Sequence, residues 1–472
     1  MHPTSRRFAA NARAAMADPV LQDALARLKA GFRVKRAAAV ARLPEFEALK
    51  AEARALKDHT LAHLDHYLEA FEAKVVETGG TVHWCRDGAE AKAAVLAICR
   101  AAGARTATKG KSMVAEEIGL NDFLEKNGVI PVETDLGEYI IQLRREPPSH
   151  IVAPAIHLNR GQVADAFRTA HGGRPPDRDL EEPRVLLDEA REEMRARFLA
   201  ADVGITGANL LIAETGSTVI VTNEGNGDLT QTLPRVHIVL ATIDKVVPTL
   251  DDAATILRLL ARSATGQELS VYTTFSTGPR RPDDLDGPEQ FHVVLLDNGR
   301  SAMLGGQFRD MLRCIRCGAC INHCPVYGAV GGHAYGWVYP GPMGSVLSPA
   351  LVGLEQTAKL PDASTLCGRC EEVCPMSIPL PALLRHWREH AFERHLKPAR
   401  ERLGLALWSF AASRPWLYRA VTRLASWGLR RLARGTGRLA RVPLAGGWTA
   451  ARDLPAPSGP GFLDQWRQGK RR

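Results

Sequence analysis

The sequence reads Cys314-x2-Cys317-x2-Cys320-x3-Cys324-Pro325 and, further on, Cys367-x2-Cys370-x3-Cys374-Pro375. These two runs contain seven of the nine cysteines of the 472-residue chain. Three cysteines at x2 intervals wrap one iron–sulfur cube, and a fourth, three residues on and followed by proline, reaches a second cube. The pattern therefore predicts an electron carrier with two [4Fe-4S] clusters.

The second run lacks one ligand. When the two runs are aligned on their Cys-Pro ends, Ser364 takes the position of Cys314. The crossed-ligand rule of two-cluster ferredoxins assigns the first cluster to Cys314, Cys317, Cys320 and Cys374, and the second to Cys324, Cys367 and Cys370. Three interpretations of the second cluster stay open: Ser364 ligates as an alkoxide, solvent or a partner group binds one iron, or one iron is missing.

Two other uses of clustered cysteines fit less well. Zinc ribbons also pair C-x2-C motifs, but they usually lack a third cysteine and a trailing Cys-Pro. Disulfide frameworks belong to short secreted chains, whereas these cysteines are clustered in a long one. Iron is therefore the expected metal.

The sequence shows neither a signal peptide nor a membrane span. Residues 1–19 contain Arg6, Arg7 and Arg13 but no apolar core of signal-peptide length. No run approaches the roughly 20 apolar residues that a membrane helix needs. We expect a cytoplasmic protein, and a length of 472 residues predicts two or three domains.

The positive charge is concentrated at the C-terminal end. Residues 381–472 contain 19 Lys and Arg against 5 Asp and Glu, and six of the eight tryptophans. Apolar residues recur there at helical spacing with arginines between them, namely Leu417, Val421, Leu424 and Leu429 with Arg419, Arg423 and Arg430. A basic amphipathic helix binds an anionic membrane or a partner, or packs on its own protein with a solvated arginine face. No nucleic-acid-binding motif accompanies the charge, so no nucleic acid is expected.

The rest of the chain is helical and then mixed. Residues 1–75 predict two or three packing helices with breaks near Pro19 and Pro44. From 76 to 300, β-branched runs alternate with helical stretches, which is typical of an α/β domain. The expected strands are 81–84, 129–131, 210–213, 218–221, 237–241 and 292–296, and the expected helices are 89–101, 114–126, 182–198 and 253–262.

Two loops of this region contain candidate catalytic carboxylates. Glu214 lies in the loop 214–217, and Glu224 lies in the loop 223–228. Backbone N–H groups and a carboxylate in such loops can converge on a small anion or polar ligand. Two tight turns without a ligand explain the same residues equally well.

A third loop resembles part of a phosphate-binding loop. Residues 108–112 end in Gly-Lys-Ser, but Arg105 stands where a Walker loop needs its first glycine, which excludes that motif. Lys109, Lys111 and Ser112 remain candidates for lining an anion pocket, although a solvated loop is the favoured interpretation.

The segment 331–344, between the cysteine runs, is dense in glycine and aromatic residues. Bare backbone and aromatic rings suit a loop that covers a cluster and excludes water. His333 within it is a candidate ligand or proton carrier, but a hydrogen-bonded loop histidine is favoured. The flanking residues 307–313, 349–360 and 380–390 indicate helices, so we expect a helical dicluster module.

Taken together, these residues resemble the lactate utilisation protein B family. The resemblance rests on residues 207–217 and 222–226, both cysteine runs, the Gly-Gly-His-Ala-Tyr-Gly loop at 331–336, and tail residues 413–415 and 452–455. It implies a cytoplasmic iron–sulfur subunit of a three-protein system that oxidises L-lactate to pyruvate. It also implies a middle domain similar to CoA-transferase and ribose-phosphate-isomerase proteins, and the same seven cysteine ligands.

The predicted organisation has four parts. A helical segment spans 1–75, an α/β lactate-utilisation domain spans 76–300, a helical dicluster domain spans 301–390, and a basic helical tail spans 391–472. The tail is expected to meet other subunits of the system or an anionic membrane surface at its periphery.

Three functions follow from this organisation. The leading hypothesis is an electron-transfer subunit with two [4Fe-4S] clusters, which is not catalytic alone. The second is an enzyme with its own site at Glu214 and Glu224, for 2-hydroxy-acid oxidation or acyl- or CoA-type chemistry. The third is a redox-sensing regulator, which requires nucleic-acid binding.

Overall fold

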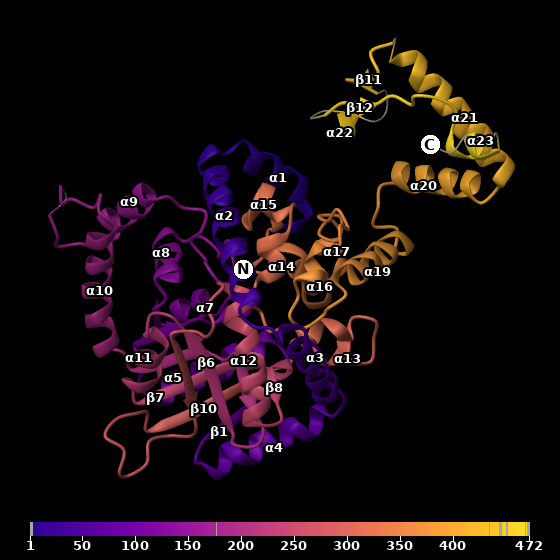
Figure 1. Cartoon of the computed structure of the whole chain (residues 1–472). Helices are drawn as coiled ribbons and strands as arrows, with labels where there is room; N and C mark the ends of the chain where they lie inside the picture. The colour runs from indigo at the N-terminus through magenta and orange to yellow at the C-terminus, as the bar shows by residue number, and fades with distance from the viewer. Residues whose placement is uncertain are drawn as a thin grey trace. The chain divides into compact units, whose positions relative to one another are not determined.

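The computed structural model describes residues 3–175, 177–433, 435–442, 446–449, 452–467 and 469. The chain divides into two compact units, Met1–Ala391 and Phe392–Arg472. Figure 1 follows both units by colour from the indigo N-terminus to the yellow C-terminus. The expected boundaries near residues 75 and 300 fall inside the first unit, where they remain predictions.

The N-terminal segment forms four α-helices after the short 3-10 turn η1 (Ser5–Arg7). These are α1 (Phe8–Ala17), α2 (Pro19–Ala41), α3 (Phe46–Ala62) and α4 (Leu64–Glu77). Asp18 caps α2 by accepting from the N–H groups of Val20 and Leu21, and Pro19 stands at its first position. The breaks near Pro19 and Pro44 are confirmed. The predicted number of helices is wrong, because a further break at His63 separates α3 from α4.

A six-stranded parallel sheet forms the centre of the α/β region. Its strands are β1 (Thr81–Cys85), β2 (Thr106–Gly110), β3 (Ile130–Glu133), β4 (Val203–Gly207), β7 (Val236–Thr242) and β10 (Gln290–Leu296). They run in the order β1-β10-β7-β4-β2-β3, and all neighbours are parallel. Every residue of β4 and β7 is buried, as expected for strands covered on both faces. The α/β prediction is confirmed.

Two hydrophobic cores cover the faces of this sheet. One packs the sheet against α5 (Gly88–Ala101), α6 (Met113–Ile118) and α7 (Leu120–Lys126). The other packs it against α4 and strands β5 and β8. The predicted single helix at 114–126 is two helices, because Gly119 takes a left-handed conformation (φ 66°) between them.

A second, four-stranded sheet has the order β8-β5-β6-β9. Its strands are β5 (Leu210–Ile212), β6 (Ser217–Thr222), β8 (Val246–Val247) and β9 (Tyr272–Ser276). The remaining helices of the region are α8 (Leu136–Arg144), α9 (Arg160–Ala170), α10 (Pro183–Leu199), α11 (Asn226–Thr232) and α12 (Leu250–Ala264). The loop predicted after β6 thus passes directly into α11.

The cysteine region is built from short helices. They are α13 (Ser301–Leu304), η3 (Arg309–Arg313), α14 (Ala319–His323), α15 (Tyr327–Val330), η4 (His333–Tyr335), α16 (Gly341–Val352), α17 (Leu354–Thr357), α18 (Arg369–Glu372) and α19 (Leu380–Glu393). Helices α1 and α2 contact α15, and α2 also contacts α14. The N-terminal helices therefore pack against the cysteine runs.

The C-terminal unit contains two longer helices, α20 (Ala399–Ala412) and α21 (Pro415–Leu432), neither of which has a buried residue. Strand β11 (Arg438–Leu439) pairs with β12 (Leu454–Pro455), and α22 (Gly446–Thr449) and α23 (Phe462–Arg467) complete the unit. Within the described residues, no helix is both long and apolar enough to cross a membrane.

Candidate metal centres and an adjoining cavity

The two cysteine runs share one backbone pattern. Cys317 and Cys367 take equivalent positions in the two runs. The residue before each has a left-handed backbone, with φ 59° at Arg316 and φ 54° at Leu366. Gly318 (φ 75°) and Gly368 (φ 83°) are then the N-cap residues of the short helices α14 and α18. Non-glycine residues adopt such angles rarely, so the repeated pair indicates one structural motif used twice.

Four thiols surround one space. The residues lining it include the predicted ligands of the first cluster, namely Cys314, Cys317, Cys320 and Cys374, and the rest of its wall is mostly apolar. Burial and the neighbouring thiols raise the pKa of Cys317 to about 12, and burial raises that of Cys374 to about 11. Thiolates so placed need positive charge between them, which an iron–sulfur cluster supplies. The residues present therefore fit such a group.

The other three thiols form a second set. Burial, then Cys324 and Cys367, raise the pKa of Cys370 to about 12, so these thiols lie close enough to interact. Cys367 is exposed, and hydrogen bonds from the Arg369 N–H and the Thr365 side chain lower its pKa. Ser364 accepts a hydrogen bond from the Leu366 N–H at 3.1 Å. Among the described residues, no three His, Cys, Asp or Glu side chains form a group of the kind that holds a single metal ion.

The loop between the runs lies against both the α/β region and the N-terminus. Tyr335, Trp337 and Tyr339 are buried. The His333 side chain hydrogen-bonds the Pro147 carbonyl at 2.8 Å, as the favoured interpretation of this histidine expected. At Gly332, any Cβ would lie 1.7 Å from the Ser149 carbonyl oxygen, so only glycine fits.

The two candidate carboxylates do not form one site. Glu214 and Glu224 lie beyond opposite ends of β6, and both are exposed. Glu214 Oε2 accepts from the Leu250 N–H at 2.9 Å, at the start of α12. Glu224 instead lies 3.5 Å from Lys111 Nζ. A shared Glu214/Glu224 pocket is therefore wrong, because six residues of extended strand separate the two loops.

The favoured solvated loop at 108–112 is also wrong. Residues 106–110 form β2, and Lys109 is fully buried, with its Nζ 2.7 Å from Glu133 and 3.0 Å from Glu116. Glu133 is the register partner of Lys109 on β3, so a cross-strand ion pair compensates the buried charge. Lys111 pairs with Asp135 at 2.9 Å.

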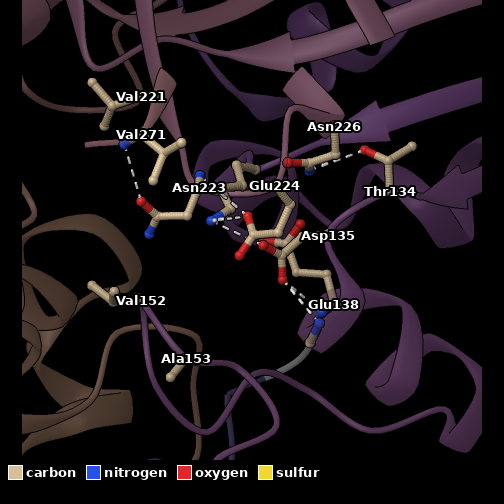
Figure 2. A network of polar contacts seen from close by, with 12 residues as sticks. Thr134, Asp135, Glu138, Val152, Ala153, Val221, Asn223, Glu224, Asn226 and Val271 are labelled. Carbon is tan, nitrogen blue, oxygen red and sulfur yellow. Dashed lines mark hydrogen bonds and ion pairs between the residues drawn. The ribbon is translucent and has the colours of Figure 1, made fainter. Parts of the chain in front are cut away.

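A cavity of about 150 Å³ lies where β2, β4 and β7 end. Figure 2 shows part of its polar surroundings, with Asp135, Glu138 and Glu224 close together. The residues that line the cavity include Lys111, Ser112, Asp135, Glu138, Asn209, Thr222, Asn223, Lys245, Leu260, Arg316, Cys317 and Tyr339. Lys111 and Ser112 thus lie at a cavity, as one of the two sequence interpretations had it, whereas Lys109 does not line it.

Three ionisable residues that the sequence did not single out also line the cavity, namely Glu138, Lys245 and Arg316. Burial lowers the pKa of Lys245 to about 8. Burial and the carboxylates of Glu133 and Asp135 raise the pKa of Glu138 well above its usual range. Arg316 lies inside the first cysteine run, between Cys314 and Cys317. No local motif marks these residues, because they come from α8, from the 3-10 turn η2 (Ile243–Lys245) and from the first cysteine run, which meet only in the folded chain.

Comparisons with known proteins give a consistent result. A LUD domain model matches residues 68–296, a 4Fe-4S dicluster domain model matches 310–378, and a model of the C-terminal domain of lactate utilisation protein B matches 392–471. These regions contain, in turn, the parallel sheet, the two cysteine runs and the C-terminal unit.

Curated relatives cover nearly the whole chain. A lactate utilization protein B from Bacillus licheniformis is 41% identical over 96% of this chain and 94% of its own length. One from Lysinibacillus sphaericus is 41% identical over 97% and 96%. An Escherichia coli protein described as the uncharacterized electron transport protein YkgF is 40% identical over 98% and 96%. A solved DUF162 family protein from Deinococcus radiodurans is 16% identical, with a TM-score of 0.25, over 49% of this chain and 98% of its own.

Proposed function

Because this chain belongs to the lactate utilisation protein B family, we propose that it is the electron-transfer subunit of a system that oxidises L-lactate to pyruvate. The observation that carries the proposal is the division of seven thiols into two adjacent sets. The names of the relatives support both the lactate system and the electron-transfer role, since they refer to lactate utilisation and to electron transport.

In this proposal the crossed cysteine scheme gives the ligands. Cys314, Cys317, Cys320 and Cys374 hold one [4Fe-4S] cluster, and Cys324, Cys367 and Cys370 hold the other. Such clusters accept and release electrons one at a time. The Cys370 thiol lies close enough to Cys320 to contribute to its raised pKa, which supports two centres side by side.

The protein's own residues bury one centre and leave the other near the surface. The first set of thiols is enclosed by mostly apolar side chains, among them Met311, Met343 and Ile378. The second set reaches the surface at Cys367, which is exposed. Burial shields one centre from water, and exposure lets a partner protein approach the other.

Ser364 occupies the position of the missing eighth cysteine. Its hydroxyl accepts from the Leu366 N–H, at the turn that both cysteine runs share. A hydroxyl oxygen has a second lone pair. We therefore keep Ser364 as the candidate fourth ligand of the second centre.

The C-terminal unit is proposed to dock the subunit. Helices α20 and α21 expose large apolar side chains, namely Leu403, Leu407, Trp408, Phe410, Trp416, Leu424 and Trp427. Exposed apolar groups so gathered mark interaction surfaces. The arginines beside them suit an acidic partner subunit or an anionic membrane surface, where each contributes about 1 kcal/mol. In this proposal the subunit is cytoplasmic and docks on a partner subunit or at the membrane periphery.

The test is reduction of the iron centres by lactate. The chain is purified anaerobically with the other components of its lactate-utilisation system, and electron paramagnetic resonance spectra are recorded before and after L-lactate. Reduced-state signals from two interacting centres are expected. The Cys374→Ala variant loses the first centre, whereas Cys99→Ala, which changes a buried cysteine of α5, keeps both. Dithionite-reducible centres that lactate leaves oxidised contradict the proposal.

A further inference from the structure

The cavity beside the cysteine region lies where an α/β sheet binds ligands. In the sheet, β2 lies between β3 and β4. The chain passes from β2 to its neighbour β3 and then crosses back over β2 to β4 on the other side. Ligands of open α/β sheets bind beyond the carboxyl ends of the strands at such a switch point. Lys111 and Ser112 follow β2, and Ala208 and Asn209 follow β4, and all four line the cavity.

Two cations face the cavity, and no described carboxylate lies within ion-pair distance of either. Lys245 is only 6% exposed, and its side chain forms no hydrogen bond or ion pair with any described residue. Arg316 donates to Met343 Sδ at 3.5 Å and lies over the Tyr339 ring, but no described carboxylate is within ion-pair distance of it. The nearby Asp244 favours the charged form of both cations, but its ion pair is with Arg300, at 3.2 Å. Buried cations left in this way favour a bound anion.

Two buried oxygens at the same cavity also lack partners. Glu138 is 7% exposed and its Oε2 has no hydrogen bond within the described structure, and Thr222 Oγ1, 2% exposed, has none either. Buried polar atoms are nearly always hydrogen-bonded, so an unsatisfied pair at a cavity indicates a polar ligand. The ligand therefore has a negative end and at least one further polar group.

The size of the cavity suits a small molecule. It measures about 150 Å³. An engineered protein cavity of about this volume binds benzene, which has as many heavy atoms as lactate or pyruvate.

The cavity and the space between the four thiols share a wall. Ile151, Arg316 and Cys317 line both. A molecule in the cavity thus lies against Cys317, one of the four thiols, and against the neighbouring side chains of Ile151 and Arg316.

We propose that this cavity binds a short carboxylate with an oxygen on its α-carbon, holding the carboxylate at Lys245 and Arg316 and the α-oxygen at Glu138 and Thr222. The choice of a 2-hydroxy or 2-oxo acid rests on the proposed function. The anion site itself rests on the unpaired cations.

The test is calorimetric titration of the full-length, iron-loaded chain without its partner subunits. L-lactate and pyruvate are the ligands, propanoate lacks the α-oxygen, and lactamide lacks the charge. Lactate or pyruvate is expected to bind saturably, with propanoate weaker and lactamide silent. Lactate binding alone assigns the site to the substrate, and pyruvate binding alone assigns it to the product. Either result supports the proposal.

Variants locate the binding. Lys245→Gln is expected to weaken affinity about tenfold or more, and Lys245→Arg to restore part of it. Thr222→Val is expected to weaken lactate several-fold and to leave propanoate unchanged. Thr218→Val, a buried threonine of β6 that does not line the cavity, and Lys74→Gln on the surface are the controls. Iron content and thermal midpoint verify that each variant is folded and loaded.

Two outcomes overturn the inference: neither acid binds, or binding survives unchanged in both Lys245→Gln and Thr222→Val. Neither outcome touches the electron-transfer proposal, because no partner is present. Conversely, binding by a chain whose centres lactate never reduces overturns the proposed function and leaves the anion site in place.

Discussion

Tyr339 donates its phenolic hydrogen bond to Glu117 Oε2 at 2.7 Å, and both side chains are buried. Tyr339 belongs to the loop between the cysteine runs, whereas Glu117 lies in α6 of the α/β region. Arg300 Nη2 reaches the same oxygen at 2.7 Å. The hydrogen bond therefore fixes the loop that forms one wall of the cavity.

Removing this link is expected to destabilise the first compact unit. Tyr339→Phe loses a hydrogen bond to a charged group, which should lower the free energy of unfolding by about 1.5–3 kcal/mol. Glu117→Gln leaves Arg300 without its bidentate partner, which should lower the free energy of unfolding by about 3–5 kcal/mol. Urea unfolding followed by tryptophan fluorescence measures the change in midpoint. Tyr67→Phe, whose hydroxyl meets His59 near the surface at 2.9 Å, is the matched control and should change little. Equal effects of the two tyrosine variants would contradict the assignment.

Acid should destabilise the same unit through its buried histidines. The Nδ1 of His150 accepts from the N–H groups of Val152 and Ala153, which requires the neutral ring. Burial lowers the pKa of His150 from about 6.5 to about 4. As the pH drops below 6.5, His150 becomes protonated in the unfolded chain but stays neutral in the folded chain down to about pH 4. The free energy of unfolding therefore falls as the pH drops through this window. The full loss is about 3 kcal/mol.

Urea midpoints between pH 7 and pH 4 check this expectation. His150→Gln should flatten the decline, although it lowers the midpoint at pH 7, because Gln carries no proton to the unfolded state. His66→Gln, at an exposed position of α4, is the control and should leave the slope as it is. An unchanged slope in His150→Gln would assign the acid sensitivity to other groups.

Iron retention should report on Ser364. Ser364→Cys supplies an eighth thiolate and is expected to reduce the three-iron signal that appears after brief exposure to air. Ser364→Ala removes the oxygen and should increase that signal. Electron paramagnetic resonance with iron analysis measures both. If Ala and Ser give the same signal, the hydroxyl only caps the turn at Leu366.

The C-terminal helices should lose binding when their exposed apolar side chains become polar. Leu424 and Trp427 of α21 are 68% and 51% exposed. The double variant Leu424→Ser/Trp427→Ser is expected to reduce co-purification with partner subunits or co-sedimentation with anionic vesicles several-fold. Leu285→Ser, which changes a fully exposed leucine of the first unit, is the control. Loss in one assay and not in the other identifies the bound surface, and no loss in either contradicts docking by α21.

Local patterns predicted the features that depend on local spacing. The cysteine runs, the breaks near Pro19 and Pro44 and the strand at 237–241 are each encoded within a few residues. The cavity is not, because the ends of β2, β4 and β7 meet only through the strand order. Lys109 was assigned to a solvated loop for the same reason, since its partner Glu133 lies on another strand. Lys245 and Arg316 likewise carry no sequence signal of their shared cavity.

The N-terminal helices are also hydrogen-bonded to the cysteine region, which comes much later in the sequence. Arg36 of α2 donates to the Val373 carbonyl at 2.9 Å, and Arg33 donates to the Asn322 carbonyl at 2.7 Å. Ser5 Oγ donates to the Tyr335 carbonyl at 2.8 Å. The N-terminal helices are synthesised first and wait for partners that emerge more than 280 residues later. The cysteine runs therefore do not form an independently folding domain. We expect iron to be inserted only after synthesis of the first unit is complete.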